Sequence, residues 1–153
     1  MNEQLSVRPV TAHDFERWLP LWDGYNEFYG RSGPTALDRA ITDATWARFF
    51  DPSEPMHALV AESSGKLLGL VHFLFHRSTT QIALTCYLED LFTVSDARGK
   101  GVGRALINAV YERAAAAGTP NVYWLTHETN AVAMRLYDAI AVRSPFVVYG
   151  KTL

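Results

Sequence analysis

The chain has 153 residues, of which 48% are hydrophobic and 20% charged, and its net charge at pH 7 is −2. Length and composition predict one globular domain over residues 1–153, and the small negative charge argues against a broad surface for nucleic acid or for a membrane. The single cysteine, the lack of a basic and then apolar leader, and the lack of any apolar stretch of about 20 residues predict a cytoplasmic protein without a membrane span.

The N-terminal third is predicted to hold one strand and two helical regions. Alternation over residues 5–10 indicates the strand, and helical spacing of apolar residues over 15–29 indicates the first helical region. Pro20 lies inside that region, so we expect either a kink or two short helices. A second helix is predicted over residues 35–50, where Thr35 and Asp38 form a capping-box pattern.

Strand patterns dominate the middle of the chain. Residues 56–63 and 66–77 read as two strands joined by a tight turn at Ser64-Gly65, and residues 83–94 read as a third long strand. Helices and strands alternate in the C-terminal part, which begins with a helix predicted from near Gly101 to residue 117.

A strand is then expected over residues 121–127, a helix over 130–140 and a last strand over 145–153. This order predicts a mixed α/β (α+β) fold with a partly antiparallel sheet flanked by helices.

The stretch "SDARGKGVGRALI", residues 95–107, places three glycines and three basic residues where a strand gives way to a helix. The first turn of a helix has unpaired N–H groups and the positive end of the helix dipole. Glycines let the backbone approach a bulky ligand, and Arg98, Lys100 and Arg104 can add charged hydrogen bonds. A phosphate or pyrophosphate is therefore the expected ligand.

The spacing excludes the two commonest nucleotide-binding motifs. No string matches the P-loop pattern, and neither Gly99-x-Gly101 nor Gly101-x-Gly103 completes the dinucleotide fingerprint. What remains is Arg98-x-x-Gly101-x-Gly103. The alternative is a glycine-rich turn whose basic residues are simply solvated.

"RGKGVG" (98–103), the upstream "YLEDLFTV" (87–94) and the downstream "THETNAVAMRLYDAI" (126–140) resemble the GNAT superfamily of acetyl-CoA-dependent N-acetyltransferases. The branch that they resemble contains the histone/polyamine and spermidine/spermine acetyltransferases. The resemblance implies a mostly antiparallel central sheet in a single N-acetyltransferase domain, acetyl-CoA as the cosubstrate and no metal. It also implies direct transfer to a primary amine, such as a polyamine, a lysine side chain or another small amine, in a ternary complex.

Carried over by position, the resemblance implies a coenzyme A site and two catalytic residues. The strand end pairs with the pantetheine arm, the loop and helix start bind the pyrophosphate, and an asparagine contacts the cofactor. These cofactor-binding residues are Phe92, Thr93, Val94, Arg98, Gly99, Lys100, Gly101, Val102, Gly103, Arg104 and Asn130. Tyr137 matches a tyrosine near the thioester sulfur, and Glu89 matches a glutamate that some members use as a general base.

Amine acetylation requires a neutral amine, a donor for the developing oxyanion and a proton for the leaving thiolate. Glu89, His127 or water can serve as the base, and Tyr137 as the proton donor. The structural alternatives are an ion pair for Glu89 and core packing for Tyr137. Adjacent residues of a strand face opposite sides, so either Glu89 or Asp90 points at a given cleft unless a bulge intervenes.

The acceptor wall is predicted on the first helical region, where Tyr25, Glu27 and Tyr29 combine aromatic rings with a carboxylate. Asp90 is a further candidate for contact with the substrate. An ordinary solvated helix face is the alternative. His72 and His76 have no evident third ligand, and Cys86 is expected in the core, so no metal site and no acetyl-cysteine are predicted.

Two further functions stay open at this point: a non-catalytic acyl-CoA-binding or sensor module on the same fold, and a binder of another nucleotide or phosphate. The apolar end "PFVVYGKTL" could complete a sheet within the chain or across a dimer. Because relatives in this branch often dimerise, we expect a homodimer.

Overall fold

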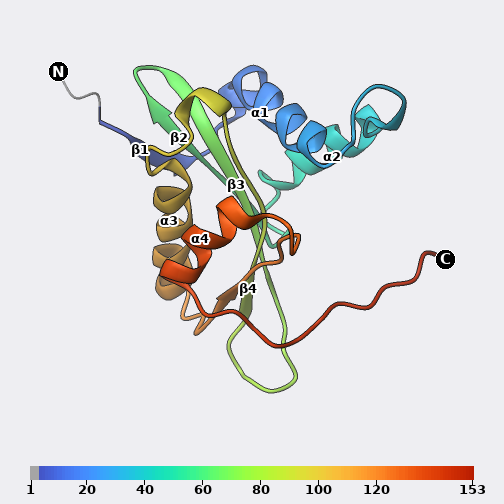
Figure 1. Ribbon diagram of the computed structural model, residues 1–153, viewed down its shortest axis with the longest axis vertical. Coiled ribbons are helices and arrows are strands. Elements are labelled where there is room, and N and C mark those ends of the chain that lie inside the picture. The colour runs from blue at the N-terminus through green and yellow to red at the C-terminus, as the bar shows by residue number, and fades with distance from the viewer. Residues whose placement is uncertain (1–3) are drawn as a thin grey trace.

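The computed structural model describes residues 4–153, which fold around a five-stranded sheet (Figure 1). The strands lie in the order β1-β2-β3-β4-β5, so each strand pairs with its neighbour in the chain. The first three pairings are antiparallel and the last is parallel. The strands are β1 (Ser6–Pro9), β2 (Met56–Ser63), β3 (Lys66–His76), β4 (Thr85–Thr93) and β5 (Val122–Tyr123). The predicted mixed, mostly antiparallel sheet is confirmed.

Helices cover both faces of the sheet (Figure 1). The helices α1 (Phe15–Phe28) and α2 (Arg39–Arg48) pack on one face, and α3 (Val102–Ala116) and α4 (Ala131–Ile140) pack on the other. Short 3-10 turns precede α1, α2 and α3: η1 (Ala12–Asp14), η2 (Gly33–Thr35) and η3 (Ser95–Ala97). The architecture is a helix–sheet–helix sandwich.

The alternation of side chains along the central strands divides the core in two. Leu59 and Val71 face α3, whereas Val60 and Leu70, on the same strands, face α1. All four side chains are almost completely buried. Burying apolar surface on both faces is the main force that fixes the strand register, because a slip by one residue would exchange the two faces.

A single helix, α1, runs through Pro20, so of the two expected outcomes, a kink or two short helices, the second is wrong. Proline removes one hydrogen bond from the helix, but Trp18, Leu21 and Trp22 bury themselves against the sheet and outweigh that loss. The second helix begins at Arg39, later than predicted. Asp38 is its N-cap and accepts a hydrogen bond from the Ala40 N–H at 2.9 Å.

The β2–β3 hairpin is confirmed, with Ser64 and Gly65 at φ +52° and +74° in the turn. The strand predicted over residues 121–127 is much shorter, because β5 contains Val122 and Tyr123 alone. Its pairing with β4 ends there, since the two strands diverge beyond Tyr87.

The expected last strand over residues 145–153 is not formed. This segment extends away from the body of the molecule (Figure 1). Its apolar side chains lie in solvent, with 89% of Phe146 and 94% of Tyr149 exposed. A strand needs a partner for its backbone, and none of the five strands of the sheet pairs with this segment.

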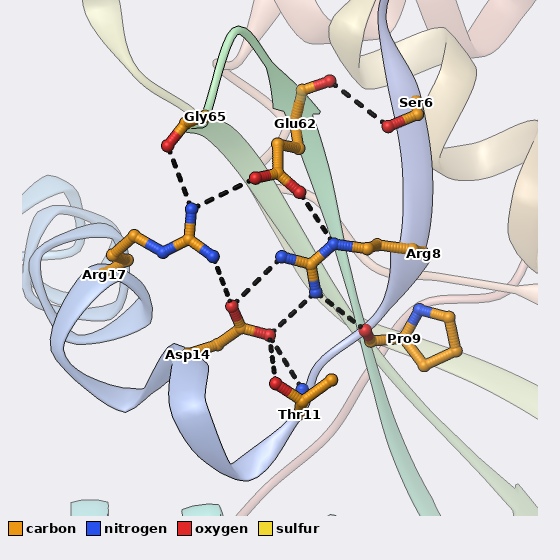
Figure 2. A network of polar contacts seen from close by, with 8 residues as sticks. All are labelled: Ser6, Arg8, Pro9, Thr11, Asp14, Arg17, Glu62 and Gly65. Carbon is orange, nitrogen blue, oxygen red and sulfur yellow. Dashed lines mark hydrogen bonds and ion pairs between the residues drawn. The ribbon is translucent and has the colours of Figure 1, made fainter.

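Charged side chains fasten the first strand to the rest of the fold (Figure 2). The buried Asp14 carboxylate accepts hydrogen bonds from Arg8 at 2.7 and 3.0 Å and from Arg17 at 2.7 Å. Glu62 on β2 accepts from the same two arginines. The hydrogen bond from Arg8 holds the pKa of Asp14 well below its usual value. The network therefore ties β1, the start of α1 and β2 together.

Candidate active site

The divergence of β4 and β5 opens the sheet on one side. Their ladder consists of the pairs Cys86–Val122 and Tyr87–Tyr123. Leu91, Phe92 and Thr93 pair with β3 on one side, and on the other side their backbone has no β5 partner. These three residues line a cavity of ≈ 610 Å³. An extended ligand can pair with such an open strand edge.

The cavity lies between the ends of four elements. Its wall combines aromatic residues of α1, the end of β4, the glycine-rich loop with the start of α3, and one side of α4. The lining residues are Tyr25, Phe28, Tyr29, Leu91, Phe92, Thr93, Ala97, Arg98, Gly99, Gly101, Val102, Gly103, Arg104, Asn130, Val132, Ala133, Leu136 and Tyr137. The structure thus brings both sequence-predicted groups, the glycine loop and the α1 aromatics, to one cavity.

The glycine-rich loop turns the chain sharply into α3. Gly101 is the N-cap of this helix at φ +84°, and Gly99 has φ +75°. Other residues rarely adopt this left-handed conformation. Gly103 is different, because its φ is ordinary and an added Cβ would meet Leu136 at 3.6 Å. Its lack of a side chain leaves space in the cavity at the helix start, where N–H groups can bind an anion.

The basic residues of the loop are not equivalent. Arg98 donates from Nε to the Thr93 carbonyl at 3.1 Å, and its guanidinium lies 5.8 Å from the ring centre of Phe92. Arg98 and Arg104 line the cavity, whereas Lys100 is exposed outside the lining. Val94 also lies outside it, packed against both hydrophobic cores. Apart from Lys100 and Val94, all the residues predicted to bind the cofactor line the cavity.

A bulge on β4 decides where its two acidic residues point. His72 pairs with Asp90 and Phe73 pairs with Leu88, so Glu89 is the extra residue. Glu89 is exposed and lies outside the cavity lining, and partial burial of its carboxyl and the nearby Asp90 carboxylate raise the pKa of Glu89. A carboxylate with a raised pKa is a stronger base than an ordinary one.

Asp90 points into the α1 side of the sheet and contacts His72. The His72 Nδ1 lies 2.9 Å from Asp90 Oδ2, and the Trp18 indole N–H donates to His72 Nε2 at 3.1 Å. These contacts are not evident in the sequence, because Trp18 and His72 are 54 positions apart. The only sequence signal was a histidine within an otherwise apolar strand.

Tyr137 lines the cavity from α4 and packs edge-on against Trp124, with ring centres 5.3 Å apart. Burial and the neighbouring Tyr29 raise the pKa of Tyr137 to about 12, so its hydroxyl keeps its proton at neutral pH. His127 is exposed and lies outside the lining, with Nδ1 2.6 Å from the Thr129 hydroxyl.

The candidate acceptor residues of α1 separate into two groups. Tyr25 and Tyr29 line the cavity together with Phe28, whereas Glu27 is exposed outside the lining. Burial and the Asp90 carboxylate raise the pKa of Tyr25 far above its usual value. Asp90 is therefore close to the Tyr25 hydroxyl, although it does not itself line the cavity.

Two other features of the chain bear on its chemistry. Burial raises the pKa of the Cys86 thiol to about 11, which disfavours a reactive thiolate. Within residues 4–153, no three His, Cys, Asp or Glu side chains gather closely enough to hold a metal ion. Over the same residues, no helix is both long and apolar enough to span a bilayer.

The open edge of β4, the start of α3 and Tyr137 of α4 meet at this one cavity. Residues 18–140 match the model of the Acetyltransferase (GNAT) family. The chain belongs to this family and is an N-acetyltransferase, an acyltransferase.

Individual relatives agree over almost the whole chain. The chain is 34% identical over 153 residues to the D-amino-acid N-acetyltransferase HPA3 of Saccharomyces cerevisiae, covering 99% of this chain and 92% of the relative. It is 28% identical over 134 residues to the uncharacterized N-acetyltransferase YhfO of Bacillus subtilis, covering 88% and 87% of the two chains.

Solved structures share the fold at low sequence identity. The aminoglycoside acetyltransferase AAC(6')-Iy, solved with a bisubstrate analogue of coenzyme A, superposes with a TM-score of 0.80 at 16% identity, covering 98% of this chain and 99% of that one. A transcriptional regulator from Bacillus halodurans gives a TM-score of 0.82 at 20% identity, covering 98% and 100%.

Proposed function

We propose that this single domain, residues 1–153, transfers the acetyl group of acetyl-CoA to a primary amine by direct attack in a ternary complex. The observation that carries the proposal is the cavity, which joins an open strand edge to a helix start and to a wall of tyrosines. Acetyl-CoA supplies the activated thioester when it is bound. The pantetheine arm would lie along Leu91–Thr93, and the pyrophosphate would meet the N–H groups at Gly101–Arg104.

The reaction needs a proton acceptor for the amine and a proton donor for the leaving thiolate. Glu89 takes a proton from the incoming ammonium, directly or through water, and the neutral amine attacks the thioester carbonyl. A backbone N–H at the end of β4, at Phe92 or Thr93, stabilises the oxyanion. The carbon–sulfur bond then breaks as Tyr137 donates its proton to the leaving thiolate. The second proton lost by the attacking nitrogen restores the Tyr137 hydroxyl through solvent. The products are an N-acetyl amine and the free thiol.

Tyr25 and Tyr29 provide the cation-binding wall for the acceptor, and Asp90 provides negative charge behind it. The resemblance to the polyamine and histone branch supports a polyamine or a lysine side chain as the acceptor. The relative at 34% identity is named for D-amino acids, which adds a free amino acid to the candidates. Glu27 lies outside the cavity lining, so its contact with the acceptor stays a prediction from sequence.

A homodimer is the assembly that we propose, with the C-terminal segment as its link. Residues 145–153 leave apolar side chains such as Phe146 and Tyr149 in solvent, and β5 has neighbours on one edge alone. A second hollow of ≈ 500 Å³ lies beside β5 and includes Val122. The segment of one copy can extend the sheet of another there, which would bury its apolar side chains. The cytoplasm is the proposed compartment, on the basis of the single cysteine.

The test of this function is an acceptor screen. The purified protein is incubated with acetyl-CoA and polyamines, lysine peptides and D- and L-amino acids, and products are identified by mass spectrometry. Acetylated product from at least one amine class is expected. Coenzyme A binding without turnover of any amine would favour the alternative, a non-catalytic acyl-CoA sensor. Competition by ATP or NAD instead of coenzyme A would favour a different nucleotide binder.

A further inference from the structure

Arg31 follows the end of α1 and lies outside the cavity lining, with its guanidinium over the rings of Tyr25 and Tyr29, which do line the cavity. Gly30, at φ +77°, reverses the chain, and its N–H donates to the Glu27 carbonyl at 2.9 Å. The Arg31 N–H then donates to the Asn26 carbonyl at 2.9 Å, which completes a Schellman-type helix end. The backbone of Arg31 is therefore held against the last turn of α1.

The side chain of Arg31 is also held, by one nitrogen. Its Nε donates to Asn26 Oδ1 at 2.7 Å, and the buried Asn26 amide donates to the Trp22 carbonyl at 2.9 Å. The guanidinium carbon lies 5.8 Å from the ring centre of Tyr25 and 5.5 Å from that of Tyr29. Within residues 4–153, its two terminal nitrogens make no hydrogen bond and meet no carboxylate within 4.0 Å.

A negative group lies near the same tyrosine. The Asp90 carboxylate and the Arg31 guanidinium both act on the Tyr25 hydroxyl, the first raising its pKa and the second lowering it. Asp90 is 13% exposed, and in the described chain its contact is the hydrogen bond with His72, with no arginine or lysine within 4.0 Å. His72 contributes no charge when Trp18 donates to its Nε2 and its Nδ1 carries the one proton.

We propose that Arg31 binds a carboxylate of the acceptor while Asp90 attracts its ammonium, so that the site selects a zwitterionic α-amino acid. This inference rests on the proposed acetyl transfer and deepens it by naming the acceptor class. A guanidinium with free terminal nitrogens offers a carboxylate two parallel charged hydrogen bonds. A polyamine, in contrast, would bring a second positive charge toward Arg31, which disfavours its binding.

The test compares amino acids with their amides in the wild type and in Arg31→Met and Arg31→Lys. Phenylalanine and phenylalaninamide, each as D- and L-forms, share everything except the carboxylate. The amide amine has a different intrinsic reactivity, which cancels when the acid-to-amide ratio of kcat/KM is compared between variants. Arg48→Met, which removes an exposed arginine of α2, is the matched control.

We expect the wild type to prefer at least one amino acid over its amide. Arg31→Met should lower that ratio by about 10- to 100-fold, the usual effect of losing a charged hydrogen bond, and Arg31→Lys by less. The KM for acetyl-CoA should change less than about 2-fold, as should every parameter of Arg48→Met.

Two results would overturn the assignment of Arg31. One is a wild type that uses amides or polyamines as well as it uses acids. The other is an Arg31→Met variant that loses acid and amide activity equally, so that the ratio is unchanged. The wild-type comparison needs no variant, so a misfolded Arg31→Met protein does not remove the test. Failure of the underlying acetyl transfer looks different, because the wild type would then acetylate no amine of any class.

Discussion

Trp18 of α1 determines which ring nitrogen of His72, on strand β3, carries the proton. An indole N–H can only donate, so the 3.1 Å contact makes His72 Nε2 an acceptor. The neutral ring then carries its proton on Nδ1, which lies 2.9 Å from Asp90 Oδ2 and donates to it. A helix residue thereby determines the orientation of a carboxylate beside the acceptor wall.

Replacing Trp18 with phenylalanine should therefore disturb both stability and acceptor binding. The variant leaves His72 Nε2 buried without its donor, which costs about 1–3 kcal/mol of unfolding free energy. We also expect acceptor KM to rise several-fold as Asp90 loses its fixed donor. Denaturant unfolding and steady-state kinetics measure the two effects.

Trp22→Phe is the matched control, because Trp22 donates to the Thr42 hydroxyl at 3.1 Å instead of to His72. A comparable loss of stability with a clearly smaller rise in acceptor KM is expected, because Trp22 meets His72 and Tyr25 by ring packing alone. If both variants change acceptor KM equally, the effect comes from general loosening of the aromatic core and not from His72.

Tyr137→Phe tests the proton donor. The substitution removes one hydroxyl from a ring that keeps its contact with Trp124, so the fold should persist. We expect kcat to fall about 10²-fold with little change in KM for acetyl-CoA, as for loss of a general acid. Tyr111→Phe removes a hydroxyl that donates to the Ile140 carbonyl outside the cavity, and should leave kcat unchanged. Equal losses in kcat and cofactor affinity would refute the acid role.

Glu89→Gln tests the base through its pH dependence. Because the pKa of Glu89 is raised above 4.5, the acid limb of the wild-type kcat profile should lie above that of an ordinary glutamate. The variant should lower kcat about 10²-fold and remove this limb. A limb that survives in Glu89→Gln would assign it to another group.

The same shift in pKa predicts a stability effect. A carboxyl whose folded pKa is raised contributes stability below its unfolded pKa, and that contribution is lost as pH rises through the folded pKa. At neutral pH the ionised group is therefore a small cost. Glu89→Gln should be at least as stable as the wild type at pH 7, measured by thermal unfolding, while being less active.

Gly101→Ala separates backbone strain from cofactor binding. At φ +84° a Cβ finds no atom within 4 Å, so the penalty is conformational, about 1 kcal/mol. Gly118→Ala, at φ +75° after the other end of α3, should cost a similar amount of stability and leave coenzyme A affinity intact. Gly101→Ala should weaken coenzyme A binding as well, measured by calorimetry. Equal affinities in the two variants would contradict the assigned anion site.

Much of this fold could be predicted from local patterns. The hairpin at Ser64-Gly65 and the helix over residues 131–140 follow from turn chemistry and apolar periodicity. The glycine spacing predicted the sharp turn before α3, where Gly99 and Gly101 both have left-handed backbone conformations. Local patterns were insufficient where pairing decides the outcome, as at β5 and at residues 145–153.

Candidate site residues that belong to a contiguous motif could be predicted, whereas those placed by contacts between distant segments could not. Tyr137 and the loop lie on contiguous motifs, whereas the pairing of His72 with Asp90 depends on a bulge that no single strand reveals. Arg31 follows a glycine in a loop, and its direction is set by a helix end and by a buried asparagine. Such residues become visible only when the layers are assembled.

The ion network around Asp14 has a consequence for the opposite side of the sheet. It fastens β1, a strand of four residues that ends in Pro9, so that edge is short and poor in free donors (Figure 2). The β4–β5 side has a long free stretch of backbone. The sheet is thus asymmetric in its capacity to grow, and an added strand, whether a cofactor arm or a neighbouring peptide, is directed to one side only.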